Sequence, residues 1–157
     1  MTTHVQPIPE GYATVTPYLI IRDAAQAIEF YKKAFNTIEH QRMDMPNGKI
    51  GHAEISIGNS RIMLADECPE MKMRGPDTAG GAPVLIHLYV DNVDHVFKQA
   101  VKMGAKVIKE LADQFYGDRL GCVVDPFGHT WSIATHKEDV SSEECIRRFE
   151  ALEKRQS

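Results

Sequence analysis

Two side chains capable of acid–base or metal chemistry, His52 and Glu54, lie two residues apart in the apolar stretch 50–57. Neighbouring residues of a β-strand face opposite sides, so this spacing places both on one face, while Ala53 and Ile55 lie on the other. Imidazole and carboxylate groups bind divalent ions and also transfer protons. Alternation alone favours simple exposure of this face to water. The arrangement of the surrounding elements therefore determines whether this face is simply exposed to water or forms a functional site.

Other reactive residue types in the chain favour structural roles. Cys122 lies beside two valines with no adjacent basic residue to activate it, which indicates a buried thiol rather than a nucleophile. Asp118 and Arg119 could close over an anionic ligand, although such a pair is more often a surface ion pair. His129 lies in a tight turn, where a role in the turn is the commoner one. We find no phosphate-binding loop, serine-hydrolase motif or zinc-finger spacing.

Composition restricts the classes of function. The 157 residues have a formal net charge of −4 and are 43% hydrophobic and 25% charged, which predicts a globular domain with a real core. The acidic balance argues against a nucleic-acid partner, and no apolar run is long enough for a membrane span. Three cysteines without a CxxC pair predict no disulfide framework. We expect a reduced, cytoplasmic protein.

An internal repeat with an offset of 69 residues organises the chain. Residues 18–23 align with 87–92, and each short apolar run leads into a segment with helical periodicity. Asp23 and Asn92 are the expected N-caps of these helices. Further along, Asn47-Gly48 aligns with Tyr116-Gly117, so each half has a glycine turn between strands. Each half is therefore predicted to contain, in this order, one strand, one helix and three strands.

The repeat defines the domain organisation. We expect a first module at 13–67, a linker at 68–83, a second module at 84–138 and a C-terminal helix in 139–157. The linker is rich in glycine and proline, which predicts a flexible connection. The N-terminal dozen residues are expected to form an unstructured arm. The final helix should begin at the capping box Ser141–Glu144 and carry an apolar stripe of Cys145, Ile146, Phe149 and Leu152.

A duplicated module that closes with Asp125-Pro126-Phe127-Gly128-His129-Thr130-Trp131 resembles the vicinal oxygen chelate superfamily, which includes glyoxalase I, bleomycin-resistance proteins and extradiol dioxygenases. Four segments are similar to its PhnB-like branch: Pro17-Tyr18-Leu19, Ala27–Tyr31, Gly51–Ile55 and Tyr116–Arg119. The resemblance implies an α+β fold of two tandem βαβββ modules. Their curved mixed sheets would have helices on the convex side and a ligand-binding cup on the concave side. Tyr31, Phe97 and Trp131 should be buried on the convex side.

Metal-dependent members of this family take ligands from the first and last strands of each module. Carried onto this chain, the resemblance places those positions at Tyr18, Met63, His87 and Ser132. Only His87 is a good ligand for a divalent ion, and a slip of one residue would place still poorer ligands there. We therefore expect no metal centre and no cofactor. The alternative is a divalent ion held by His52, Glu54 and His87.

The resulting prediction is a small-molecule-binding protein of this superfamily. We expect its cup to be lined by Tyr18, His52, Glu54, Met63, His87, Tyr89 and Ser132. The alternative is an enzyme, namely a lyase, isomerase or dioxygenase that uses a divalent ion, or one that uses Glu54 as a metal-free base. Members resembling this chain commonly form dimers, so we expect a homodimer. Neither a nucleic acid nor a membrane is an expected partner.

Overall fold

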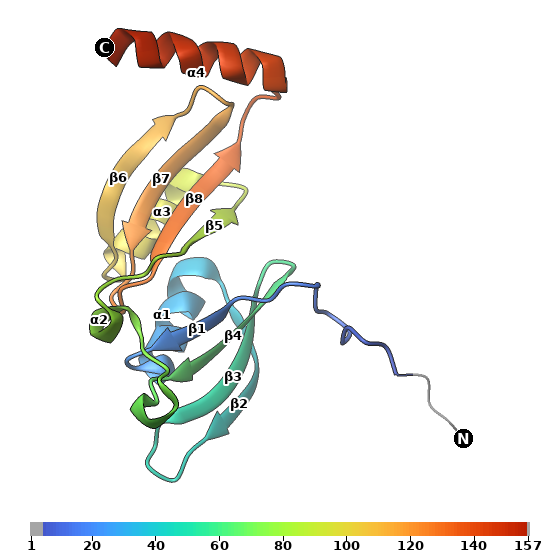
Figure 1. Ribbon diagram of the computed structural model, residues 1–157, viewed down its shortest axis with the longest axis vertical. Helices are drawn as coiled ribbons and strands as arrows, with labels where there is room; N and C mark the ends of the chain where they lie inside the picture. Colours follow the sequence, from blue (N-terminus) through green and yellow to red (C-terminus); the bar gives the residue numbers. More distant parts are fainter. Residues whose placement is uncertain (1–4, 157) are drawn as a thin grey trace. The chain divides into compact units, whose positions relative to one another are not determined.

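The computed structural model describes residues 5–156, which form two compact units that divide between residues 82 and 83 (Figure 1). Each unit contains a four-stranded mixed sheet and repeats the order strand, helix, three strands. The predicted pair of βαβββ modules is therefore confirmed. No helix in the described part of the chain is both long and apolar enough to cross a membrane.

The first unit contains four strands and three helical segments. In chain order these are β1 (Tyr18–Ile21), α1 (Ala24–Phe35), β2 (Ile38–Asp44), β3 (Ile50–Ile57), β4 (Ser60–Asp66), the 3-10 helix η1 (Pro69–Met71) and α2 (Pro76–Ala79). The strands are arranged β1-β4-β3-β2, with β1 parallel to β4 and the other pairs antiparallel. Helix α1 packs on one face of this sheet, which leaves the side chains of the other face free to form a site.

The second unit repeats this arrangement. Its elements are β5 (Leu85–Tyr89), α3 (Val93–Lys102), β6 (Lys106–Asp113), β7 (Asp118–Val124), β8 (Thr130–His136) and α4 (Ser142–Gln156). The sheet order is β5-β8-β7-β6, with β5 parallel to β8. Tyr31 and Trp131 are fully buried and Phe97 is 6% exposed, as predicted for the helix-covered sides.

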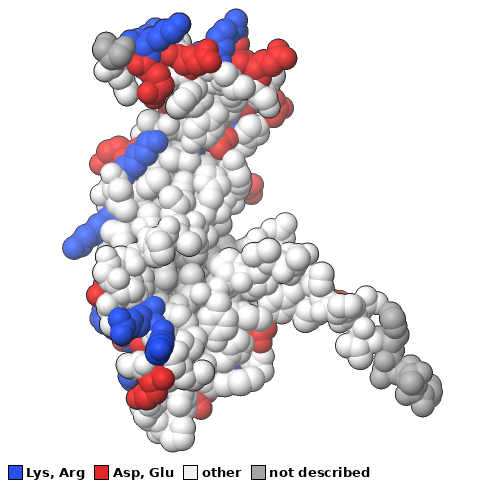
Figure 2. All heavy atoms as spheres, in the orientation of Figure 1, with Lys and Arg blue, Asp and Glu red and all other residues white. Residues whose placement is uncertain are grey.

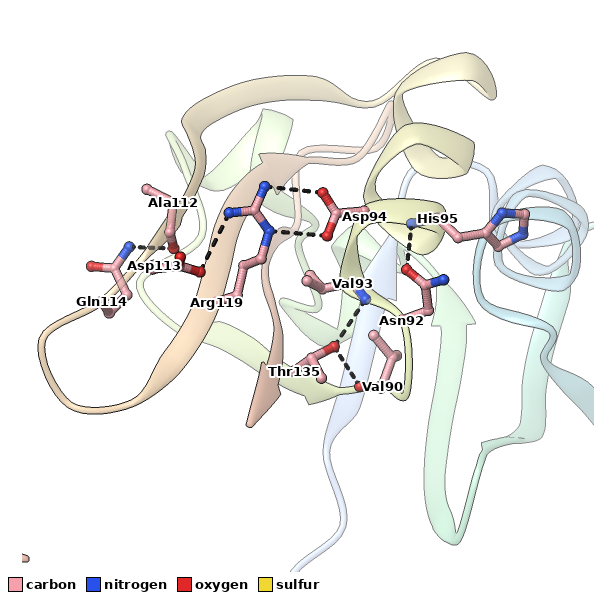
Figure 3. A network of polar contacts seen from close by, with 10 residues as sticks. All are labelled: Val90, Asn92, Val93, Asp94, His95, Ala112, Asp113, Gln114, Arg119 and Thr135. Atoms are coloured by element: carbon pink, nitrogen blue, oxygen red, sulfur yellow. Dashed lines mark hydrogen bonds and ion pairs between the residues drawn. The ribbon is translucent and has the colours of Figure 1, made fainter. Parts of the chain in front are cut away.

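The N-termini of α1 and α3 are stabilised in the same way. The Asp23 carboxylate accepts from the Gln26 amide at 3.3 Å, and the Asn92 side chain accepts from the His95 amide at 3.1 Å. These bonds satisfy amides of the first turn, as predicted. A side chain at the end of the last strand adds a second bond in each unit. In the first unit Asp66 accepts from the Ala24 amide. In the second, Thr135 accepts from the Val93 amide (Figure 3).

The motif that carried the family resemblance is a structural turn built around a buried carboxylate. Asp125, which is 3% exposed, accepts from the backbone amides of Phe127 and His129 with one oxygen and from the Trp131 indole with the other, at 2.9–3.0 Å. The carboxylate thus joins the turn to the core of the second unit. This position agrees with the expected role of His129 in a turn.

The repeat offset changes by one residue in the third strand of each module. Tyr18 pairs with Met63 and His87 pairs with Ser132, which keeps the offset of 69 in the first and last strands of each module. Glu54 pairs with Met63, however, whereas Cys122 pairs with Ser132, so the offset between β3 and β7 is 68. The paired residues Cys122 and Ser132 are ten positions apart in the sequence, whereas Glu54 and Met63 are nine apart. The structural equivalent of Glu54 is therefore Cys122.

The connection between the modules has more local structure than its glycine and proline content predicts. Glu67 accepts from the Gly75 amide at 2.7 Å, and Cys68 forms an isolated bridge with Met73. The Arg22 guanidinium also lies 2.8 Å from the Asp77 carboxylate. Side-chain hydrogen bonds thus order this segment against the first unit.

The final helix begins where the capping box predicts, with the Ser141 hydroxyl accepting from the Glu144 amide at 3.2 Å. Acidic and basic side chains lie side by side along α4 (Figure 2), and Glu144 forms ion pairs with both Arg147 and Arg148. The predicted apolar stripe is present but exposed, since Ile146 and Phe149 are 59% and 51% exposed.

Candidate functional site

A chain of polar side chains crosses the open face of the first sheet. His52 and Glu54 project from β3, on the face opposite the buried residues Ala53 and Ile55. The Tyr18 hydroxyl from β1 lies 2.8 Å from His52 Nδ1, and His52 Nε2 lies 3.6 Å from the Glu54 carboxylate. The two sequence-predicted residues of β3 therefore interact with each other and with Tyr18. Burial raises the pKa of Tyr18, which keeps its hydroxyl protonated.

The N-terminal arm contributes a residue that the sequence did not indicate. The Tyr12 hydroxyl donates a hydrogen bond to Glu54 Oε1, and the Arg61 guanidinium lies 5.3 Å from the centre of the Tyr12 ring. The expectation of an unstructured arm is therefore wrong at this residue. No spacing or composition in the arm predicted the contact, because the partners lie 42 residues apart in the sequence.

The four positions that the resemblance assigned to metal ligands form two equivalent pairs. Tyr18 is paired with Met63 across the parallel strands β1 and β4, and His87 is paired with Ser132 across β5 and β8. His87 Nδ1 lies 3.0 Å from the Ser132 hydroxyl. The donor set thus contains a phenol, a thioether, an imidazole and an aliphatic hydroxyl, of which only the imidazole binds divalent ions well.

The alternative metal-binding set is divided between the two units. His52 and Glu54 lie in the first unit, whereas His87 lies in the second. Among residues 5–156, no group of three or more His, Cys, Asp or Glu side chains has the geometry to hold a metal ion. His52 and Glu54 therefore lie close to each other without a third ligand from their own unit.

A second polar network lies on the open face of the second sheet and centres on Asp118. This carboxylate is 3% exposed; it accepts from the Tyr89 hydroxyl at 2.8 Å and lies 2.7 Å from His136 Nδ1. His136 Nε2 lies 2.7 Å from the exposed Asp139 carboxylate. A pocket of about 600 Å³ lined by Tyr89, Val90, Asp91, Thr135 and His136 adjoins this network.

Hydrogen bonds to Asp118 shift the pKa values of its two partners, His136 and Tyr89. The bond to Asp118, followed by that to Asp139, raises the pKa of His136. The bond to Asp118 likewise raises the pKa of Tyr89. Both hydrogen bonds therefore favour the protonated forms of His136 and Tyr89. The sequence missed Asp118 and His136 as a pair because they lie on neighbouring strands, 18 residues apart.

Asp118 and Arg119 are neighbours in β7 and point to opposite faces of the sheet, and both line a pocket of about 590 Å³ at the start of the strand. Arg119 binds Asp94 at the start of α3 through two bonds of 2.9 and 3.0 Å, and it also approaches Asp113 at 3.4 Å (Figure 3). Arg119 thus forms ion pairs, but its partners are Asp94 and Asp113 rather than Asp118. Its guanidinium links the helix to the sheet.

Comparisons with known proteins agree with this architecture. The family model described as the Glyoxalase/Bleomycin resistance protein/Dioxygenase superfamily matches residues 11–133. The uncharacterized protein Mb0911c of Mycobacterium bovis is 44% identical over 133 residues, covering 83% of this chain and 88% of the relative. Among solved structures, a PhnB protein from Bacillus cereus has a TM-score of 0.62 at 16% identity, covering 78% of this chain and 99% of that one.

A further solved structure is a mutant of the fosfomycin resistance protein FosX from Listeria monocytogenes, complexed with Mn(II) and 1S,2S-dihydroxypropylphosphonic acid. It has a TM-score of 0.62 at 15% identity and covers 87% of this chain and 97% of that one. At such identity the likeness concerns the fold. The match of the family model over most of the chain places this protein in the glyoxalase/bleomycin resistance protein/dioxygenase superfamily.

Proposed function

We propose that this protein binds a small organic molecule on the open faces of its sheets without a resident metal ion. The observation that supports this most is the donor set at the family's ligand positions. Phenol, thioether and hydroxyl groups compete poorly with water for a hard or borderline divalent ion. Tyr18 and Ser132 in addition interact with His52 and His87, so their oxygens are directed to imidazole partners.

The residues on these faces suit a binding site for an organic ligand. Such sites combine aromatic walls with a few convergent polar groups. The first unit offers Tyr18, His52 and Glu54 on one face. The second offers Tyr89, whose ring packs edge-on against the His87 ring at 4.6 Å between centroids. Met63 and Ser132 complete the predicted lining.

A second candidate function is catalysis. His52 Nε2 and the Glu54 carboxylate lie 3.6 Å apart. This proximity is compatible with a divalent ion bound by His52, Glu54 and His87, and also with proton transfer by Glu54 without a metal. In the first case the ion would act as a Lewis acid on a substrate oxygen, as in a lyase, isomerase or dioxygenase. In the second, the carboxylate would accept a proton from the substrate.

Three further assignments accompany this proposal. The Gly51–Ile55 and Tyr116–Arg119 segments support membership of the PhnB-like branch. Exposed apolar residues on the outer strands β2 and β6, such as Ile38 and Ile108 at 60% and 58% exposure, support a homodimer that covers sheet edges. Three free cysteines support a reducing, cytoplasmic location.

A ligand screen combined with metal analysis tests the proposal. A thermal-shift screen of small molecules should identify a compound that raises the melting temperature, because binding to the folded state stabilises it. Bound metal is then measured in the native protein and in His52→Ala, Glu54→Ala and His87→Ala. The proposal predicts no stoichiometric metal and a ligand affinity that falls in these variants.

The other outcomes are equally informative. Stoichiometric metal that disappears in any one variant would favour the enzyme over the binding protein. Stoichiometric metal that survives all three changes would contradict both the placement of the ligands and the alternative set.

A further inference from the structure

We propose that the open face of the first unit recognises a phenol, and that Tyr12 of the N-terminal arm occupies this subsite as an internal copy of the ligand. The inference rests on the proposed function, because it assumes that this face binds small molecules, and it adds the chemical class of the ligand. It also assigns a role to the arm, which competes with the free ligand.

The contacts of Tyr12 are those that a bound phenol would make. Its hydroxyl donates to the Glu54 carboxylate, and its ring lies 5.3 Å below the Arg61 guanidinium. A carboxylate is a strong acceptor for a neutral hydroxyl, and a guanidinium over an aromatic ring is a cation–π contact. Together the two contacts select a ring that carries a hydroxyl.

The sheet holds both recognition groups independently of the arm. Glu54 belongs to β3 and Arg61 to the adjacent strand β4, and both face the side of the sheet opposite α1. Glu54 also lies close to His52, which in turn contacts Tyr18. Tyr12, by contrast, reaches the subsite from outside the sheet, where its backbone amide makes a local bond to the Pro9 carbonyl. The arm can therefore leave while the subsite keeps its shape.

The backbone beside Tyr12 supports a close fit of the arm on Arg61. Gly11 has a φ of +84°, and a Cβ atom there would lie 3.0 Å from Arg61 Nη2. Glycine permits this conformation and this approach at once. The glycine thus lets the arm present the Tyr12 ring beneath the guanidinium.

The same two groups exclude other classes of ligand. A carboxylate or phosphate ligand placed against Glu54 would meet a like charge, which opposes binding. An aliphatic alcohol would satisfy Glu54 but would lack the π face that Arg61 contacts. A neutral aromatic hydroxyl compound satisfies both.

Tethering gives Tyr12 an advantage over a free competitor. A group on a short flexible linker has an effective concentration of the order of millimolar, so a free phenol must exceed that level or bind more tightly to displace it. Removing the Tyr12 side chain should consequently raise the affinity for an external phenol.

The test uses 4-methylphenol, which is the tyrosine side chain as a free molecule, and measures its dissociation constant by NMR titration of the full chain. We expect Tyr12→Ala to bind 4-methylphenol at least about tenfold more tightly than the wild type, since the tethered competitor is gone. The matched control is Val5→Ala, a change at an exposed residue of the arm, which should leave the affinity unchanged. 4-Methylanisole, which has no hydroxyl proton to donate, should bind Tyr12→Ala at least about tenfold more weakly than 4-methylphenol.

A second variant identifies the subsite. Adding Glu54→Leu to Tyr12→Ala should abolish the gain in affinity, because the acceptor is lost. Equal affinity of the wild type and Tyr12→Ala for 4-methylphenol, or a gain that persists without Glu54, would overturn the inference. A different ligand from the thermal-shift screen that weakens in His52→Ala would then leave the proposed function standing while the phenol class is rejected.

Discussion

At the scale of single residues, Asp118 is the group on which the second network depends. It lies 2.7 Å from His136 Nδ1, and this contact is the main cause that raises the pKa of His136. We predict that Asp118→Asn lowers the pKa of His136 towards its ordinary value, because the charged acceptor is removed. Titration of the His136 ring signals by NMR measures this directly. Asp139→Asn should produce a smaller decrease, since Asp139 is the second cause and is fully exposed at its side chain.

The same contact makes stability depend on pH in a defined direction. The pKa of His136 is higher in the folded state, so its contribution to the free energy of unfolding is fully present below the ordinary histidine range. That contribution is lost as the pH rises through the folded-state pKa. Urea unfolding at several pH values should show this loss in the wild type and a reduced loss in Asp118→Asn. The same slope in both proteins would show that the contact does not stabilise the fold.

Asp125 is the second residue whose role the structure defines. Asp125→Ala removes an acceptor shared by two turn amides and the buried Trp131 indole. Because buried donors would lose their partner, we predict that the free energy of unfolding falls by about 2–4 kcal/mol. Chemical denaturation measures this loss of free energy of unfolding. Asp44→Ala, at an exposed position of β2, should stay within about 0.5 kcal/mol of the wild type; a similar loss in both variants would contradict the role of the turn.

At the scale of elements, the two glycine turns provide a matched pair. Gly48 and Gly117 both have positive φ, +83° and +103°, and they lie 69 residues apart. A Cβ atom at Gly117 would lie 2.1 Å from the Glu138 carbonyl oxygen, whereas a Cβ at Gly48 would meet nothing within 4 Å. The Gly117 carbonyl also accepts from the amides of Lys137 and Glu138. This turn therefore holds the segment that follows β8.

We predict different costs for alanine at these two turns. Gly48→Ala should lower the free energy of unfolding by about 1 kcal/mol, which is the cost of the left-handed conformation alone. Gly117→Ala should lower it by at least about 2 kcal/mol more, because the Glu138 backbone must also move. Chemical denaturation of both variants tests this. Equal losses would mean that the backbone contact at Glu138 has no energetic consequence.

At the scale of the whole molecule, we predict a homodimer in solution. The outer strands β2 and β6 expose apolar residues, and unpaired strand edges are commonly covered in stable proteins. Light scattering at several concentrations should give twice the 17.6 kDa mass of the chain. A monomer mass at all concentrations would contradict the prediction.

The sequence by itself determined the repeated architecture. The spacing of apolar residues and the offset of 69 predicted both helices, their caps at Asp23 and Asn92, and the equivalence of Tyr18 with His87 and of Met63 with Ser132. These features follow from local periodicity and from hydrogen bonds between residues close in sequence. Strand alternation likewise placed His52 and Glu54 on one face.

The tertiary structure alone decided which distant side chains meet. Tyr12 reaches Glu54 across 42 residues, and Tyr89 reaches Asp118 across 29. Such contacts depend on strand order and on the path of the arm, which leave no periodic signal in the sequence. The third strands also differ in register by one residue, because the paired residues Cys122 and Ser132 are ten positions apart whereas Glu54 and Met63 are nine apart. A shift of one residue changes which side chain occupies a position, so the equivalence of Glu54 with Cys122 became visible only once the strands were paired.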